Sequence, residues 1–158
     1  MRDTSREGII RRFRLGTDMK TRFCLATLAI VLFLPTAFGQ APETRKAIRE
    51  VIQAQLAAFQ SDDDALAFSY ASPEIQARLG SPTRFMSMVR AGYDPVYRPT
   101  AVEFQELHAD GEERWVQQVL LVDREGRPVL AFYPMRPQAD GSWRIGGCTL
   151  MPVEAQSL

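Results

Sequence analysis

Cysteine and histidine are scarce in this chain, which has two cysteines and one histidine among 158 residues. Cys24 lies in an apolar segment near the N-terminus and Cys148 lies near the C-terminus. Once that segment is removed, Cys148 has no partner for an internal disulfide, so packing must stabilise the fold. We expect Cys148 to act as a small buried hydrophobic residue, with a reactive or intermolecularly paired thiol as the alternative. His108 has no neighbouring cysteine or second histidine, so we expect no metal site, no cofactor and no catalytic triad.

A long hydrophobic run is also missing. The run at 23–34 has only 12 residues before Pro35, whereas a helix needs about 20 apolar residues to cross a bilayer. Basic residues precede this run, and small residues follow it at Ala37 and Gly39. This order predicts a secretory signal peptide that is cleaved near Gly39. An uncleaved N-terminal anchor is the alternative.

Both alternatives place the folded part outside the cytoplasm, so we predict a periplasmic or secreted protein. Residues 1–39 form the signal peptide region, with Met19 as the favoured start because the segment before it is long for a signal peptide. Whether residues 1–18 are translated stays open. Residues 40–158 form a single α+β domain, with no stable membrane insertion after cleavage. Their 119 residues are enough to bury a hydrophobic core.

An excess of charge of one sign is absent, with 19 basic and 19 acidic residues. Residues 1–39 hold 7 basic and 3 acidic residues, which leaves 12 basic and 16 acidic residues in 40–158, a net charge of −4. Such a mildly acidic domain lacks the basic surface that binds nucleic acid or anionic lipid. We therefore exclude both partners.

Helical patterns occupy the first half of the predicted domain. Apolar residues recur at three- and four-residue spacings within 43–60, which predicts an amphipathic helix. The segment Ser61-Asp-Asp-Asp64 predicts an N-cap and an acidic first turn for a second helix through Tyr70. A metal-binding loop is the disfavoured alternative, because consecutive aspartates on a helix point in different directions. The pairs Ser72-Pro73 and Ser81-Pro82 predict two short helices that end at glycines.

Strand patterns occupy the second half. The proline-rich segment 93–99 is expected to be non-helical, and strands are predicted at 101–107, 114–123, 128–135 and 143–151. Short turns between them predict antiparallel neighbours. Both faces of strand 114–123 are partly apolar. We therefore predict an α+β fold with N-terminal helices packed on a curved four-stranded antiparallel sheet.

Three parts of the chain resemble an uncharacterised bacterial family catalogued as domain of unknown function 4864. They run from Ala47-Ile-Arg49 to Ala58-Phe59, from Asp62-Asp63 to Ala71-Ser72-Pro73, and from Phe85-Met86 to Tyr97-Arg98-Pro99. The plan is similar to the nuclear transport factor 2-like, or cystatin-like, cone, in which a long helix lies across a bent sheet. That superfamily includes ketosteroid isomerase-like enzymes, ligand binders and dimerisation domains, so the resemblance implies a fold and no reaction.

Tyr93, Tyr97 and Arg98 are the candidate ligand-binding residues. They form the densest cluster of aromatic rings and arginine in the domain, and Arg98 could hold a carboxylate or phosphate. The structural interpretation, which we favour, is that the rings pack under the helices and Arg98 pairs with an acid such as Glu103.

An isomerase would need a carboxylate base and a tyrosine donor in the cone. The candidate bases are Asp94, Glu103 and Asp123, and the candidate donors are Tyr70, Tyr93, Tyr97 and Tyr133. No motif selects among them, so the catalytic residues stay unknown. Our leading hypothesis is a non-catalytic binding or interaction module, with a homodimer and a small apolar ligand as candidate partners. The alternative is a small isomerase, dehydratase or hydrolase that acts in the cone.

Overall fold

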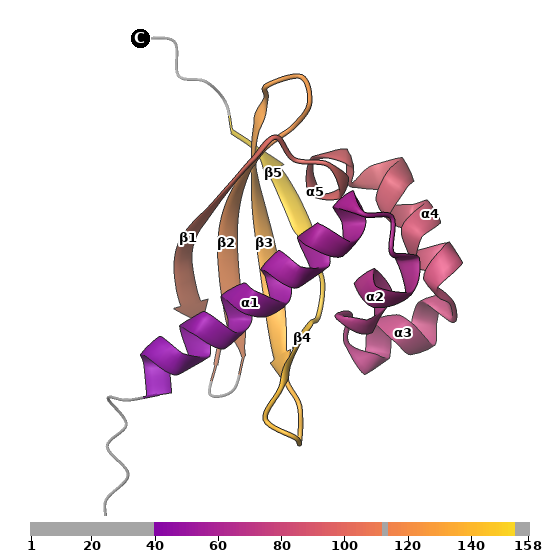
Figure 1. Cartoon of the computed structure of the whole chain (residues 1–158). Helices are drawn as coiled ribbons and strands as arrows, with labels where there is room; N and C mark the ends of the chain where they lie inside the picture. The colour runs from indigo at the N-terminus through magenta and orange to yellow at the C-terminus, as the bar shows by residue number, and fades with distance from the viewer. Residues whose placement is uncertain (1–39, 112–113, 154–158) are drawn as a thin grey trace, which may run out of the picture. The chain divides into compact units, whose positions relative to one another are not determined.

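Helices come first and strands follow, as Figure 1 shows. The computed structural model describes residues 40–111 and 114–153, all within one unit, Thr36–Leu158. The predicted signal peptide, residues 1–39, lies outside the described residues. None of the described helices combines the length and the apolar character needed to span a bilayer.

The long helix α1 spans Gln40–Gln60 and begins three residues before the predicted position. Ile48, Ile52, Leu56 and Phe59 are buried, at most 4% exposed, and they share one side of the helix. Figure 1 shows α1 lying across one face of the sheet. The apolar residues whose spacing predicted the helix are therefore the residues that hold it on the sheet.

Four short helices follow and gather beside the C-terminal end of α1 (Figure 1): α2 (Asp64–Ser69), α3 (Pro73–Leu79), α4 (Pro82–Gly92) and α5 (Asp94–Tyr97). Gly80 ends α3 with a φ of 74°, a left-handed conformation that favours glycine. The segment 61–64 contains the N-cap of the second helix, as predicted. Asp63 is the N-cap, and its carboxylate accepts from the Leu66 amide at 3.0 Å.

The expectation that 93–99 contains no helix was wrong. Asp94–Tyr97 forms a single helical turn, α5, with a proline at its first or second position. The fixed φ of proline suits the start of a helix, where the missing N–H has no helical partner to lose. Pro95 therefore lies at the start of a short helix and does not break one.

The sheet contains β1 (Ala101–Ala109), β2 (Trp115–Val122), β3 (Pro128–Pro137), β4 (Trp143–Ile145) and β5 (Thr149–Pro152). The order is β1-β2-β3-β4, with β5 also paired to β3, and all these pairs are antiparallel. This arrangement confirms the predicted α+β fold with a curved antiparallel sheet.

The last predicted strand, 143–151, is divided into β4 and β5. Gly146 lies at the break, and its amide donates to the carbonyl of Pro134 at 2.7 Å. A Cβ at this position would approach Cγ of Arg136 to 3.0 Å and the Pro134 carbonyl oxygen to 3.1 Å. The close backbone approach therefore requires glycine and interrupts the regular ladder.

The two faces of the sheet have different environments. Val119, Leu121, Ala131 and Met135 point toward α1 and are fully buried. The alternate residues of β2 and β3 form an outer face on which apolar side chains are only half-buried, listed here as Val116, Leu120, Val122, Leu130, Phe132 and Pro134. The prediction that both faces are partly apolar is confirmed.

Candidate functional site

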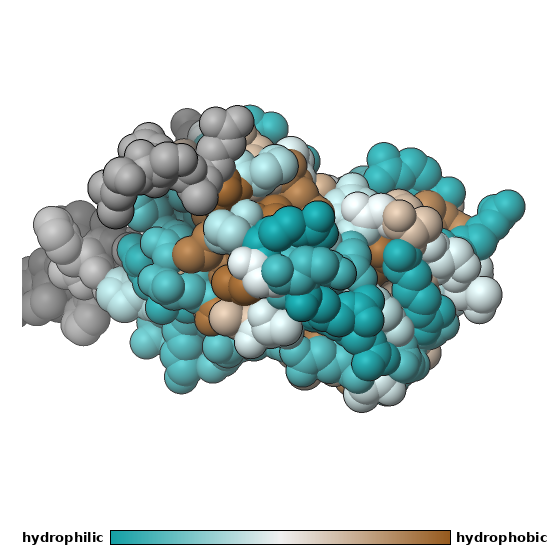
Figure 2. Space-filling model, turned by 90° about the horizontal axis from the view of Figure 1, so that it is seen from above, coloured by the Kyte–Doolittle hydropathy of each residue, from teal (hydrophilic) through white to brown (hydrophobic). Residues whose placement is uncertain are grey.

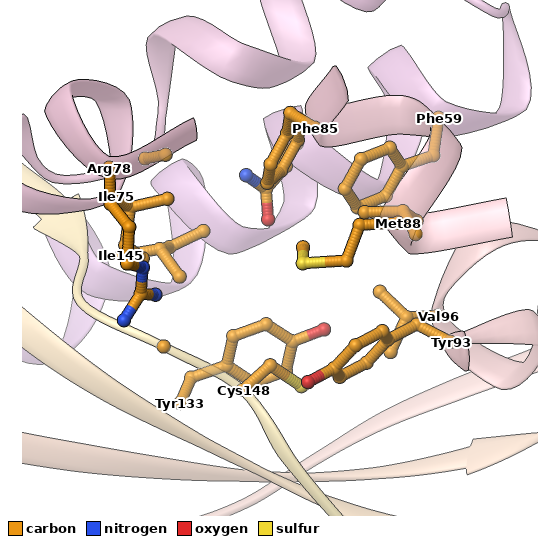
Figure 3. Close-up of a pocket in the computed structure, with 14 residues that line it drawn as sticks. Phe59, Ile75, Arg78, Phe85, Met88, Tyr93, Val96, Tyr133, Ile145 and Cys148 are labelled. Atoms are coloured by element: carbon orange, nitrogen blue, oxygen red, sulfur yellow. The ribbon is translucent and has the colours of Figure 1, made fainter. Parts of the chain in front are cut away.

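A cavity of about 100 Å³ lies between the helices and the inner face of the sheet (Figure 3). Side chains from α1, α3, α4 and α5 form one side, and residues from β3, β4 and the β4–β5 connection form the other. Most of its wall is apolar, as contributed by Phe59, Ile75, Phe85, Val89, Val96 and Ile145.

Tyr133 of β3 places a polar group in this apolar space. The residue is 1% exposed, and its hydroxyl has no hydrogen-bond partner among the described residues. Figure 3 shows the ring extending across the floor of the cavity. Burial raises the pKa of Tyr133 well above its ordinary value, so the phenol stays protonated near neutral pH and has a proton to donate.

The Cys148 thiol lies close to Tyr133 (Figure 3). Sulfur is a weak hydrogen-bonding group, and the thiol does not reach hydrogen-bond geometry with the phenol. Burial raises the pKa of Cys148 to about 12, so the thiolate is not populated at physiological pH. Cys148 is half-buried and free, and it therefore contributes a polarisable wall and not a nucleophile.

Gln55, Met88, Arg78 and Tyr93 also line the cavity. Gln55 is 3% exposed, and its side-chain amide donates to the carbonyl of Ala67 at 3.0 Å, which ties α1 to α2. Met88 is 38% exposed and lies over the space opposite Tyr133 (Figure 3). Its unbranched thioether side chain can adopt several rotamers, which makes this part of the wall adaptable.

The structure separates the three ligand-binding residues predicted from sequence. Tyr93 lines the cavity, whereas Tyr97 and Arg98 belong to a surface cluster around Asp62. Nη2 of Arg98 lies 2.7 Å from Oδ2 of Asp62, and the Tyr97 hydroxyl donates to Oδ1 of the same carboxylate. The acid beside Arg98 is thus Asp62 and not Glu103, whose carboxylate accepts from Gln105.

Arg90 completes this Asp62 cluster, with Nη2 at 3.2 Å from Asp62 and 3.0 Å from Asp64. The guanidinium carbons of Arg90 and Arg98 lie 5.5 and 5.0 Å from the centre of the Tyr97 ring, within cation–π range. Hydrogen bonding from Tyr97, with support from both arginines, lowers the pKa of Asp62. Because its charges pair with one another, the cluster joins the α1–α2 turn to α4 and α5.

The three candidate bases lie away from the cavity wall. Asp94 pairs with Arg124 at 2.6 Å, and Glu103 is exposed on β1. Asp123 is 1% exposed and binds Arg127 at 2.6 Å. Burial opposes its ionisation, but the backbone amide and guanidinium of Arg127 outweigh burial and lower the pKa of Asp123. None of these carboxylates can act as a base in the cavity from its present position.

His108 lies on β1, with Nε2 at 3.2 Å from Glu106 and 2.8 Å from the side-chain amide of Gln118. Within 40–111 and 114–153, no group of three or more histidine, cysteine, aspartate or glutamate residues is placed to hold a metal ion.

A family model described as Domain of unknown function (DUF4864) matches residues 41–158. The chain belongs to the DUF4864 family. The match covers every residue of the cavity, from Gln55 to Cys148. No curated protein and no solved structure matches the chain.

Sequence analysis of this DUF4864 chain did not identify most of the cavity wall. Ile75, Arg78 and Phe85 come from short helices whose mutual packing has no local signal. Tyr133 was one of four candidate donors, and strand alternation could have favoured it. It shares the inner face of β3 with Ala131 and Met135, whereas Tyr97 lies in the Asp62 cluster.

Proposed function

We propose that this DUF4864 chain is a non-catalytic binding module that takes up a small, mostly apolar molecule with a hydrogen-bond acceptor. The unpartnered hydroxyl of Tyr133 carries this proposal. Leaving a buried donor unsatisfied costs about 1–3 kcal/mol. A ligand oxygen at the hydroxyl would recover that hydrogen bond, while the aromatic and aliphatic wall would receive the apolar part.

The size of the cavity limits the ligand. A cavity of 150 Å³ with apolar walls holds a benzene ring, and the cavity here measures about 100 Å³ with an adaptable wall at Met88. The cavity is therefore smaller than one that holds benzene, so a single ring enters only if Met88 moves or if part of the ring lies in the open side of the cavity. The cavity also accepts the end of a longer molecule, because it is partly open.

Binding is better supported than catalysis because the cavity wall lacks a base. An isomerase of this type needs a carboxylate to remove a proton and a donor to stabilise the oxyanion. Among the described residues that line the cavity, Tyr133 and Tyr93 offer donors, but no aspartate, glutamate or histidine is present. An isomerase, dehydratase or hydrolase is the alternative function. The described cavity wall offers such an enzyme a tyrosine donor but no carboxylate base.

The proposal includes a cellular location and a wider fold relationship. The basic, apolar and small-residue order of 20–39 supports export from the cytoplasm. The long helix α1 across a bent antiparallel sheet supports membership of the nuclear transport factor 2-like superfamily. A bacterial periplasm fits both features.

Benzamide tests the binding function, because it combines one ring with a carbonyl acceptor. We expect it to bind the full chain, as its host processes it, with a Kd of roughly 0.1–1 mM, given the ligand efficiency of small molecules. Two-dimensional amide NMR measures this binding, and the largest shifts are expected around the cavity, including Tyr133, Ile145 and Cys148. Shifts confined to the outer sheet face, or no saturable shift at 10 mM, roughly ten times the upper limit of that Kd range, would refute the proposal.

Pairing of two copies through the outer face of the sheet is a second candidate function. Half-buried Leu120 and Leu130 lie opposite each other in the β2–β3 register, and Met151 of β5, which is 54% exposed, lies opposite Leu130. Figure 2 shows hydrophobic patches at the surface between hydrophilic regions, seen from above. Adjacent apolar side chains on an open sheet favour association with another apolar surface.

A charge on this face tests the pairing. We expect a dimer at micromolar concentration and a monomer for Leu120→Lys, because a lysine buried at the interface has no partner charge. Sedimentation velocity distinguishes the two states. Gln53→Lys, on an exposed position of α1, is the matched control and should leave the dimer intact. A wild-type monomer at 100 µM, roughly a hundredfold above the low micromolar Kd, would exclude this function.

A further inference from the structure

Arg78 is the one charged side chain among the 14 described residues that line the cavity. It projects from the last turn of α3, and Figure 3 shows its guanidinium at the side of the cavity, beyond Ile75 and beside Ile145. Arg78 forms no side-chain hydrogen bond or ion pair with any residue that the structure describes. An arginine is thus available at the edge of an apolar space that contains an unsatisfied donor.

Five of the eleven arginines in 40–158 are paired with acids. Those within ion-pair distance of a carboxylate are Arg90, Arg98, Arg114, Arg124 and Arg127. The sequence places 16 acidic residues in 40–158, yet none of the described ones reaches Arg78. The cavity therefore has a net positive edge in a domain whose overall charge is negative.

We infer that the ligand of this cavity is a small carboxylic acid, held in its ionised form by Arg78. This inference rests on the proposed binding function and names the chemical class of the ligand. The planar guanidinium offers parallel N–H donors that match the two oxygens of a carboxylate. A positive edge also attracts anions from solution and repels cations of the same shape.

Arg78 and Tyr133 bind different parts of this ligand. Arg78 holds the carboxylate at the edge, and the neutral Tyr133 hydroxyl donates to a second acceptor on the ligand, deeper in the cavity. The rings of Phe59 and Phe85 and the side chain of Val96 contact the apolar body between these points. A ring-sized acid with an additional oxygen, such as a hydroxy- or oxo-substituted aromatic acid, would reach both Arg78 and Tyr133.

Arg78 has an alternative structural role at the C-terminus of α3. A cation in the last helical turn interacts favourably with the helix dipole. That role requires only the charge and predicts no preference between an acid and its amide in the cavity. The comparison of two isosteric probes separates the two roles.

Benzoate and benzamide are such probes, because they have the same shape and differ in charge at pH 7. We expect the full chain, processed by its host, to bind benzoate about five- to tenfold more tightly than benzamide, as a charge-assisted hydrogen bond at a partly exposed site allows. Raising the salt concentration should weaken benzoate binding and leave benzamide binding unchanged. NMR titration or calorimetry measures both affinities on one sample.

Three variants assign the preference to the guanidinium. Arg78→Gln should bind the two probes equally, and Arg78→Lys should keep a reduced preference, because it retains the charge without the planar fork. Arg84→Gln is the matched control, since Arg84 is exposed on α4 and does not line the cavity. It should behave as the wild type.

The outcomes distinguish this inference from the function on which it rests. Equal binding of benzoate and benzamide by the wild type overturns the carboxylic acid and leaves the binding function intact. A preference for benzoate that persists in folded Arg78→Gln also overturns it. If neither probe binds to folded wild-type protein, the binding function itself fails.

Discussion

Replacing Ile52 with alanine is expected to lower the free energy of unfolding by about 2–5 kcal/mol. Ile52 is 0% exposed and lies on the side of α1 that packs against the sheet. The substitution removes three buried carbon atoms, and the surrounding side chains cannot fill the space fully because the core is close-packed. Since domains of this size are stable by only about 5–15 kcal/mol, a large part of the total would be lost.

Urea denaturation followed by circular dichroism measures this loss. Gln53→Ala is the matched control, because Gln53 is exposed on the same helix and alanine favours helix at least as well as glutamine. We expect its unfolding free energy to stay within about 0.5 kcal/mol of the wild type. A comparably small change for Ile52→Ala would mean that α1 does not pack on the sheet in solution.

Replacing Tyr133 with phenylalanine is expected to change stability and binding in opposite directions. The variant removes a buried hydroxyl that has no partner among the described residues and retains the ring. The free energy of unfolding of the ligand-free protein should therefore rise by about 1–3 kcal/mol. The affinity for benzamide should fall about three- to tenfold, because the hydrogen bond to the carbonyl is lost.

Thermal unfolding without ligand and NMR titration with benzamide measure the two effects. Tyr97→Phe is the contrasting variant, because its hydroxyl donates to Asp62 outside the cavity. It should lower the melting temperature and leave benzamide binding unchanged. A destabilised Tyr133→Phe would show that the hydroxyl is satisfied in solution, and it would remove the main support for a ligand at that point.

The predictions that succeeded depend on local periodicity. The buried stripe of α1 follows from apolar residues at helical spacing, and the alternation in β2 places Val119 and Leu121 on the inner face. The two Ser-Pro pairs also begin helices as predicted, and the Ser81 hydroxyl accepts from the Arg84 amide at 3.3 Å, whereas Ser72 at the start of α3 forms no side-chain cap. Each of these features depends on residues within one or two turns of one another.

Two of the predictions that failed depend on contacts between distant residues. Arg98 pairs with Asp62, 36 residues away, and not with nearby Glu103. The predicted strand 143–151 is divided because Gly146 bonds to Pro134 on β3 and Ile145 bonds to Tyr70 and Ser72 before α3. These interactions compete with the regular ladder, and no local pattern reports them.

The α+β class, the amphipathic helix α1 and the antiparallel order β1-β2-β3 were predictable from the amino-acid sequence alone. These properties follow from composition and from side-chain periodicity along the backbone. The folded chain alone shows that Tyr133, Arg78 and Cys148 line one cavity and that Tyr97 and Arg98 lie in the separate Asp62 cluster. The physical reason is that a cavity is the space left between packed elements, so its lining depends on how α3, α4 and β3 come together and not on any segment alone.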